Sequence, residues 1–248
     1  MTGLLRDKVC IVTGAGKGIG RAIAESFAAE GAYVYANDAR EGSVDSWLIA
    51  SEMRHRIMPL YFNITDSAGV KNALTHIKKE KQRLDVLVNN AGVEYNELIG
   101  MISQENMEKM FSINVFGTIE MLQMASRLMS RQESGGSIIN ISSLVGIRGN
   151  RGQLVYSATK GAVIALTKSA AKELASKNIR VNSIAPGLTK TEMMEAADIE
   201  KLKGRIANIS MGRIAEPSDI ARACVFFASD LSGYVSGQVL VVDGCTIM

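Results

Sequence analysis

Short apolar runs alternate with longer amphipathic stretches along the whole chain. Each apolar run has four or five residues and lacks the strict alternation of a strand with one face in water, so both faces are expected to be covered. We therefore predict buried strands at residues 9–13, 33–37, 58–62, 86–89, 137–141, 180–184 and 239–242.

The stretches between these runs have the spacing of apolar positions that is typical of amphipathic helices. They predict helices at residues 18–29, 46–54, 67–79, 103–130, 153–175 and 217–228. Because strands and helices alternate, the pattern indicates an α/β fold with a Rossmann-type, doubly wound parallel sheet of about seven strands and helices on both faces. No linker or repeat interrupts the pattern, so residues 1–248 form one predicted domain. Its least patterned region, about 191–212, is a candidate flap over the pocket.

Composition and charge narrow the class of protein without changing this picture. The chain is 47% apolar and 21% charged with a net charge of +3, which is typical of a globular domain and offers no broad basic face for nucleic acid. No apolar run approaches the ~18 residues of a membrane span, and the first residues lack the apolar core of a signal peptide. The three cysteines are scattered without metal-ligand spacing, so we expect reduced thiols, no metal site and a cytoplasmic location.

A glycine-rich loop joins the first predicted strand to the first predicted helix. Residues 13–20 read Thr-Gly-Ala-Gly-Lys-Gly-Ile-Gly. Glycines let backbone amides approach a pyrophosphate closely, and the N-terminus of the following helix adds a favourable dipole. A plain strand-to-helix turn also uses glycine, but this position near the start of the chain indicates dinucleotide binding. The candidate contacts are Gly14, Lys17, Gly18, Ile19 and Gly20.

A carboxylate follows at the end of the second predicted strand. Asp38 lies 18 residues after Gly20, close to the spacing at which an acidic residue binds the adenosine ribose hydroxyls. It would repel a 2′-phosphate, which favours NAD(H). Lys17 and Arg40 could approach such a phosphate and leave NADP(H) open, although both are also explained as solvated loop charges.

A tyrosine and a lysine lie four residues apart in the predicted helix 153–175. Tyr156 and Lys160 therefore share one helix face. A free phenol has a pKa of about 10 and is a poor base at neutral pH, but a nearby ammonium would lower that value. Ser143 lies thirteen residues upstream, just after a predicted strand, where its hydroxyl could donate to a carbonyl oxygen. Ser142 is an alternative to Ser143 for this role. Tyr156 and Lys160 alone could be ordinary exposed residues of a helix, but Ser143, Tyr156 and Lys160 together indicate proton transfer to a carbonyl.

These motifs resemble those of the classical short-chain dehydrogenases/reductases. The resemblance covers nearly the whole chain in order and spacing. The residues that carry it are the loop Thr13-Gly14 to Gly18-Ile19-Gly20, Asn89-Asn90-Ala91-Gly92, Asn114, Ser143, Tyr156-Ser157-Ala158-Thr159-Lys160 and Pro186-Gly187-Leu188-Thr189-Lys190-Thr191.

The resemblance implies four catalytic residues. Tyr156 is the general acid–base, and Lys160 lowers the pKa of Tyr156 and binds the nicotinamide ribose. Ser143 orients the carbonyl or alcohol, and Asn114 holds a water in a proton relay to Lys160. Without the other three residues, Asn114 would be an ordinary polar residue of a helix.

The resemblance also implies where the cofactor binds. Asn90 braces the sheet beside it, Thr191 approaches the carboxamide or pyrophosphate, and Asn63 with Ile64 meets the adenine. The family usually has aspartate where Asn63 stands, but an amide can still meet the adenine amino group. Besides the loop and Asp38, the implied contacts are Asn63, Ile64, Asn90, Ala91, Gly92, Tyr156, Lys160, Pro186, Gly187, Thr189 and Thr191.

Within the family, the chain is most similar to the 3-oxoacyl-[acyl-carrier-protein] reductases of fatty acid biosynthesis. The stretches 143–153 and 211–219 carry this similarity and are shared with dehydrogenases of hydroxyacids, sugars and polyols, which stay open as alternatives. The substrate is therefore expected to be a small molecule or a carrier-bound acyl group. Arg148 or Arg151 could meet an anionic part of it, although both are equally explained as solvated charges. Met193 and Met194 could form an apolar wall in the flap.

The family resemblance also implies an assembly. Its two long helices, here 103–130 and 153–175, pair between subunits, so we expect a homotetramer built as a dimer of dimers. Six of the 13 methionines lie between Met101 and Met129, and we expect core packing to explain half of them.

Two other functions compete with carbonyl reduction. An epimerase or dehydratase of the same fold usually has a longer C-terminal part, for which 248 residues leave little room. A non-catalytic nucleotide-binding scaffold would be expected to have lost a catalytic residue, and none is missing here.

Overall fold

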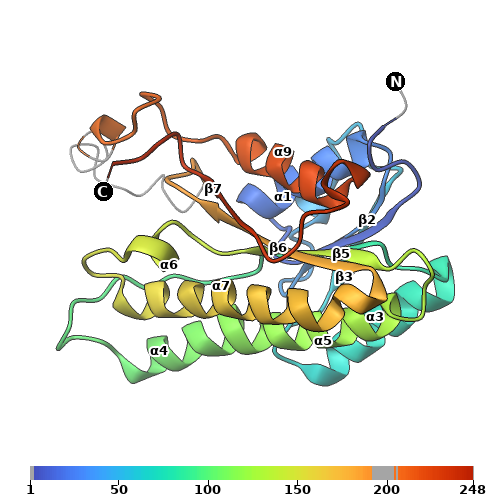
Figure 1. The fold of residues 1–248 in the computed structure, drawn as a ribbon, viewed down its shortest axis with the longest axis horizontal. Helices are drawn as coiled ribbons and strands as arrows, with labels where there is room; N and C mark the ends of the chain where they lie inside the picture. Colours follow the sequence, from blue (N-terminus) through green and yellow to red (C-terminus); the bar gives the residue numbers. More distant parts are fainter. Residues whose placement is uncertain (1–2, 192–203, 205, 248) are drawn as a thin grey trace.

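The computed structural model describes residues 3–191, 204 and 206–247. Its centre is one sheet of seven parallel strands in the order β3-β2-β1-β4-β5-β6-β7 (Figure 1). This confirms the predicted fold class. The strands are β1 Val9–Val12, β2 Tyr33–Asp38, β3 Ile57–Tyr61, β4 Val86–Asn89, β5 Gly136–Ile141, β6 Ile179–Pro186 and β7 Val239–Val242.

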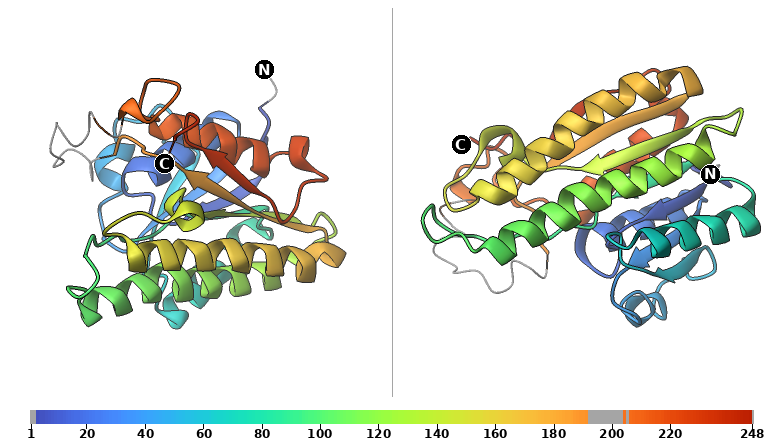
Figure 2. Two further views of the ribbon diagram at one scale, coloured as in Figure 1. Left: turned by 60° about the vertical axis from the view of Figure 1, so that its left-hand side comes forward. Right: turned by 90° about the horizontal axis from the view of Figure 1, so that it is seen from below.

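Helices cover both faces of the sheet, as Figures 1 and 2 show. They are α1 Gly18–Ala29, α2 Asp45–Leu48, α3 Ser67–Lys81, α4 Gln104–Phe111, α5 Thr118–Met129, α6 Val145–Arg148, α7 Leu154–Leu174 and α9 Pro217–Ala228. A π-helical turn, Ser112–Gly117, joins α4 to α5, and single 3-10 turns follow α7 and α9 at Ala175–Lys177 and Asp230–Ser232. Among the described residues, no helix is both long and apolar enough to cross a membrane.

Two apolar cores explain why the strands read as continuous apolar runs. On one face, α1 and α9 pack on the sheet around fully buried Phe27 and nearly buried Phe227. On the other, α3, α5 and α7 pack around residues such as Ile77 and Met121. A strand buried on both faces gains from an apolar side chain at every position. Of the six methionines between Met101 and Met129, three are fully buried, namely Met110, Met121 and Met129, which confirms that core packing explains half of the group.

The second predicted helix is much shorter than expected. Only Asp45–Leu48 is helical, whereas residues 49–54 form turns. Trp47 is the buried residue of this helix, and the following Ile49 is 77% exposed. Past Leu48, Ile49 and Ala50 are exposed and Met53 is only partly buried against the core, so packing does not stabilise further turns of helix. The short helix α6 was not predicted, because four residues are too few to show a period.

The strand order places an open crevice at one edge of the sheet. Successive connections run in opposite directions from β1, toward β2 on one side and toward β4 on the other. Loops that leave the carboxyl ends of β1 and β4 therefore diverge, and ligands of such sheets bind between them. Of the predicted flap, residues 191, 204 and 206–212 are described; Met193 and Met194 lie outside the described residues.

Candidate active site

A cavity of about 1050 Å³ lies at the carboxyl edge of the sheet. Its described lining comes from the segments that follow β1, β2, β4, β5 and β6, together with α7, residues 208–209 and the C-terminal residues 246–247. The strand order runs along the cavity, so the cavity has two ends that are lined by different strands. The nucleotide end lies at β2 and β1, and the reacting end lies at β4, β5 and α7.

Glycines at the nucleotide end occupy positions that admit no side chain. Gly14 has a φ of +64°, and a Cβ there would lie 2.8 Å from the Cα of Ala91. A Cβ on Gly20 would lie 2.2 Å from the carbonyl oxygen of Gly14 and 2.5 Å from Nδ2 of Asn90. At these two positions the loop therefore presents backbone to the cavity, which fits the close approach of a pyrophosphate.

Asn90 and Thr13 tie this loop to the end of β4. The Asn90 amide nitrogen Nδ2 donates to the carbonyl oxygens of Thr13 and Gly14 at 2.9 and 3.0 Å. The hydroxyl oxygen of Thr13 accepts from the backbone nitrogens of Asn90 and Ala91 at 3.0 and 3.1 Å. These bonds hold the glycine loop in place before any ligand binds, as the predicted bracing role of Asn90 requires.

Asp38 stands at the end of β2 and lines the cavity beside the loop. Its Oδ2 accepts from the backbone nitrogen of Gly16 at 3.1 Å, and its Oδ1 accepts from that of Arg40 at 3.0 Å. Lys17 is exposed and also lines the cavity, whereas Arg40 is exposed and does not. Each carboxylate oxygen keeps a further acceptor site. The residues present thus fit the adenosine half of a dinucleotide.

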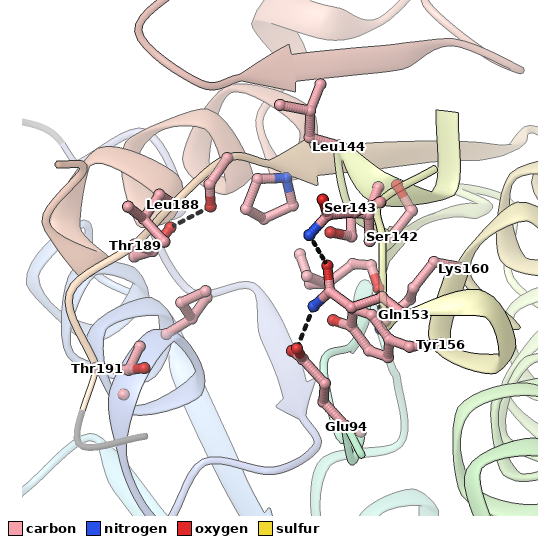
Figure 3. A pocket seen from close by; sticks show the side chains of 18 of the residues that line it. Glu94, Ser142, Ser143, Leu144, Gln153, Tyr156, Lys160, Leu188, Thr189 and Thr191 are labelled. Atoms are coloured by element: carbon pink, nitrogen blue, oxygen red, sulfur yellow. Dashed lines mark hydrogen bonds between the residues drawn. The ribbon is translucent and has the colours of Figure 1, made fainter. Parts of the chain in front are cut away.

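Tyr156 and Lys160 meet the cavity from α7 at the reacting end (Figure 3). Lys160 is 5% exposed, and its Nζ donates to the carbonyl oxygen of Ile141 at 2.8 Å. The same nitrogen lies 5.7 Å from the centre of the Tyr156 ring. The two side chains are therefore neighbours on one helix face, as their spacing predicted.

The pKa of Tyr156 moves in the direction opposite to the prediction. Burial raises the pKa of this phenol, the carboxylate of Glu94 raises it further, and a hydrogen bond with Ser143 lowers it. Burial also lowers the pKa of Lys160 to about 8, against the effect of Glu94. The physical reason is that burial disfavours the charged form of both groups. Tyr156 is accordingly a protonated acid at neutral pH in this structure.

Ser142 and Ser143 both line the cavity, but the Ser142 hydroxyl is already bonded within the sheet. The Ser142 hydroxyl donates to the carbonyl oxygen of Ile184 at 2.9 Å and accepts from the Ser183 hydroxyl at 2.8 Å, so it bonds within the sheet. Ser143 is half-buried, lines the cavity and lies close enough to Tyr156 to act to lower the pKa of the phenol. Ser143, the serine that the thirteen-residue spacing favours, is therefore the one of the two whose hydroxyl has no partner within the sheet among the described hydrogen bonds.

Asn114 lies behind the cavity wall in the π-helical turn. It is 1% exposed and does not line the cavity. Its Oδ1 accepts from the backbone nitrogen of Val93 at 2.8 Å, and its Nδ2 donates to the Val93 oxygen at 2.9 Å and to the Thr159 hydroxyl at 3.1 Å. Asn114 therefore fastens the segment after β4 to α7, next to Lys160. π-Helical turns are frequent at functional sites.

Three further residues with proposed ligand contacts lie away from the cavity. Ile64 is 5% exposed and belongs to the core under α5, and Asn63 is exposed with its Oδ1 accepting from the backbone of Thr65 at 3.0 Å. Neither lines the cavity, and neither does Arg151. Arg148 does line it, but its guanidinium donates to the carbonyl oxygen of Thr246 at 2.6 Å. The other proposed cofactor contacts all line the cavity.

Sequence reasoning missed two parts of the lining. One is the C-terminal segment, where the backbone of Ile209 pairs with Thr246 and brings Thr246 and Ile247 to the cavity. No local pattern in these residues signals that contact. The other is the pair Glu94 and Gln153 (Figure 3). Glu94 follows β4 at the ligand-binding edge of the sheet, and Gln153 precedes Tyr156 by three residues, so position alone could have drawn attention to both.

Comparisons with known proteins agree with this geometry. A protein-family model described as enoyl-(acyl carrier protein) reductase matches residues 14–245. The 3-oxoacyl-[acyl-carrier-protein] reductase FabG of Thermotoga maritima is 40% identical over 97% of this chain and 98% of its own length. A 3alpha-hydroxysteroid dehydrogenase of Mediterraneibacter gnavus is 39% identical over 97% of both chains. The FabG protein of Escherichia coli is 36% identical over 96% of both chains.

Proposed function

Because this chain belongs to the short-chain dehydrogenase/reductase family and is thus a nicotinamide-dependent oxidoreductase of carbonyl and alcohol groups, we propose that it reduces 3-oxoacyl thioesters to 3-hydroxyacyl thioesters. The observation that carries the proposal is that Ser143 and Tyr156 line the same cavity as the glycine loop. Relatives named for this reaction align along nearly the entire chain. The names of these relatives specify a substrate bound to acyl carrier protein, so a carrier-bound acyl group is the proposed physiological form.

The residues that would hold the cofactor are the glycine loop, Asp38 and the segments after β4 and β6. The nicotinamide supplies the hydride. Asp38 supports NAD(H) as the preferred form, since its carboxylate would repel a 2′-phosphate and Arg40 lies outside the cavity lining. Lys17 lies inside it and keeps some use of NADP(H) in the proposal.

The chain's own side chains perform the proton chemistry. The hydroxyl groups of Ser143 and Tyr156 both donate to the substrate oxygen, which stabilises the negative charge that develops there. The Tyr156 proton passes to that oxygen as the carbonyl carbon becomes an alcohol carbon. Its raised pKa keeps the phenol protonated for this step. Lys160, with a pKa of about 8, can exchange protons near neutral pH and so restore the phenol, with Asn114 holding the segment beside it.

Reduction of a carbonyl is separable from the other reactions that the comparisons suggest. We would test acetoacetyl thioesters, a crotonyl thioester, a 3-oxosteroid, a hydroxyacid and a sugar, each with NADH and NADPH (NAD⁺ or NADP⁺ for the alcohols), by the change in nicotinamide absorbance. The expected result is turnover of acetoacetyl thioesters, faster with NADH. Turnover of the crotonyl thioester alone would contradict the proposal and favour reduction of a carbon–carbon double bond. A preference for the steroid would favour the second candidate, a hydroxysteroid dehydrogenase, which rests on the relative from Mediterraneibacter gnavus.

We also propose that the protein assembles as a homotetramer, a dimer of dimers. Two apolar surfaces support it. Phe116 and Ile119 are 62% and 45% exposed along the α4–α5 run, and Leu240 and Val241 are exposed on the edge strand β7. Exposed apolar patches of this kind are typical of interfaces. Light scattering coupled to gel filtration should give a tetrameric mass, and Phe116→Lys should lower it; a monomeric mass of the unmodified chain would refute the proposal.

A further inference from the structure

A carboxylate stands at the reacting end that the proposed proton transfer does not use. Glu94 lines the cavity two residues after Gly92, in the segment that follows β4. Figure 3 shows its side chain extending from below toward Gln153, beside Tyr156. Among the described residues, the charged groups that line the cavity at this end are Glu94, Lys160 and Arg148. Arg148 donates to the carbonyl oxygen of Thr246, and Lys160 donates to that of Ile141.

A chain of amide groups holds this carboxylate in place. The Gln153 Nε2 donates to Oε1 of Glu94, and the Gln153 Oε1 accepts from Nδ2 of Asn150 at 2.5 Å. Gln153 is 7% exposed, so its orientation is set by packing as well as by these bonds. Its amide must present N–H, not C=O, to an ionised carboxylate. The backbone nitrogen of Glu97 also donates to the oxygen of Gly152 at 2.8 Å, which joins the two segments that carry Glu94 and Gln153.

The charge of Glu94 acts on Tyr156 and Lys160. Its carboxylate acts to raise the pKa of both Tyr156 and Lys160, as an anion close to both must. A substrate whose carbonyl oxygen meets Ser143 and Tyr156 therefore places the neighbouring part of the molecule within the field of Glu94. A second negative charge there would meet repulsion in a partly buried site, where screening by water is weak.

We propose that Glu94, fixed by Gln153, is a specificity-determining residue that excludes substrates with a carboxylate one carbon beyond the reacting carbonyl and admits neutral esters and thioesters. The inference rests on the proposed carbonyl reduction and deepens it, because it separates 3-oxoacyl thioesters from free 3-oxo acids. The inference also predicts that the part of the substrate next to Glu94 is uncharged, whatever carrier is attached further from the carbonyl.

The test compares two substrates with the same reacting carbonyl, ethyl acetoacetate and acetoacetate. Wild-type protein should have the higher kcat/KM for the ester. Glu94→Gln removes the charge at nearly constant volume and should reduce the ester-to-acid ratio by about tenfold, mainly through a lower KM for acetoacetate. Glu94→Asp keeps the charge and should largely restore the ratio. Glu105→Gln removes the same charge from an exposed position of α4 and should leave the ratio unchanged.

A binding measurement keeps this test independent of turnover. Calorimetric titration of both compounds into wild-type and Glu94→Gln protein, with NAD⁺ present, should show acetoacetate gaining affinity in the variant while ethyl acetoacetate does not. If no variant turns over any carbonyl substrate, the proposed reductase function fails and titration alone decides the inference. If the ester is reduced but Glu94→Gln leaves both the ratio and the affinities unchanged, the role of Glu94 is refuted and the reductase function stands.

Discussion

The two ends of the cavity are built on different principles. The nucleotide end is made of backbone, and its decisive positions are those where a Cβ would collide, such as Gly14 and Gly20. The reacting end is made of side chains whose charges are shifted by burial and by one another, among them Tyr156, Lys160 and Glu94. The nucleotide end depends on the absence of side chains at its glycines, and the reacting end depends on charges held at fixed positions. Substitutions at the nucleotide end should therefore weaken cofactor binding. Substitutions at the reacting end should instead lower the rate or change its pH dependence.

The largest effect should follow from removing the phenolic hydroxyl. Tyr156→Phe takes away the proton donor while leaving the ring, so kcat for reduction should fall by roughly 10²–10⁴, the usual contribution of general acid catalysis. Steady-state kinetics with acetoacetyl thioester measures it, and the change in cofactor affinity should be much smaller than the change in kcat. Tyr234→Phe, at a fully exposed tyrosine, is the control. Retained turnover in Tyr156→Phe would exclude the phenol as proton donor. It would also contradict the view that the reacting end acts through its side chains.

At the nucleotide end, Gly20→Ala should weaken cofactor binding while leaving the acid–base groups intact. The added Cβ would meet the Gly14 oxygen and the Asn90 amide, and overpacking of this kind costs about 1–3 kcal/mol, a loss of roughly five- to hundredfold in affinity. The single tryptophan, Trp47, is a local probe, because its Nε1 donates to the oxygen of Ala15 in the loop at 3.2 Å. Fluorescence titration with NADH therefore measures the affinity.

The control for this substitution is Gly161→Ala in α7. A Cβ at Gly161 meets only the oxygen of Gly146, at an ordinary contact distance of 3.4 Å. That variant should bind NADH as the wild type does. Equal affinities of Gly20→Ala and Gly161→Ala would show that the loop does not need to exclude side chains, against the description of this end given above.

A smaller effect should follow at Asp38, where the nucleotide end does use a charge. Asp38→Asn removes the repulsion of a 2′-phosphate, so the ratio of kcat/KM for NADH over NADPH should fall by roughly tenfold, as expected for one charge pair near the surface. Kinetics with both cofactors measures the ratio. Asp45→Asn, an exposed aspartate that accepts from the Tyr61 hydroxyl at 2.6 Å, should leave it unchanged. If both variants keep the wild-type ratio, Asp38 has no part in choosing the cofactor.

The smallest effect concerns pH. Oxidation of the 3-hydroxy product needs the Tyr156 phenolate as base, and since the pKa of Tyr156 is raised, the rate of oxidation should increase with pH above neutrality. Glu94 contributes to that raised pKa, so Glu94→Gln should shift the profile to lower pH, by less than about one unit for a single charge in a partly hydrated site.

The measurement for this prediction is kcat/KM for oxidation as a function of pH. Lys160 Nζ lies 5.7 Å from the centre of the Tyr156 ring, and this lysine is present in both the wild type and the variant, so the comparison isolates the charge of Glu94. Glu105→Gln serves again as the control for loss of a negative charge. A shift to higher pH, or a profile identical to wild type, would mean that the Glu94 charge does not reach the phenol.

Local patterns were sufficient for most of the fold and for much of the site. The strands and five of the six predicted helices are present within a few residues of their predicted bounds, and the helix predicted at 46–54 was wrong beyond Leu48 because no buried face continues there. Tyr156, Lys160 and Ser143 meet at the cavity as predicted. Arg148 was foreseen as a cavity residue, but its bond to the oxygen of Thr246, 98 residues away, could not be.

The amino-acid sequence by itself determined the alternation of strands and helices, the glycine loop and the shared helix face of Tyr156 and Lys160. These depend on side-chain periodicity and on backbone conformation, which act over a few residues. Only the tertiary structure decided that Glu94 meets Gln153, 59 residues away, and that the pKa of Tyr156 rises instead of falling. Burial and electrostatic fields are sums over groups from distant parts of the chain, so their sign is settled only where those parts come together.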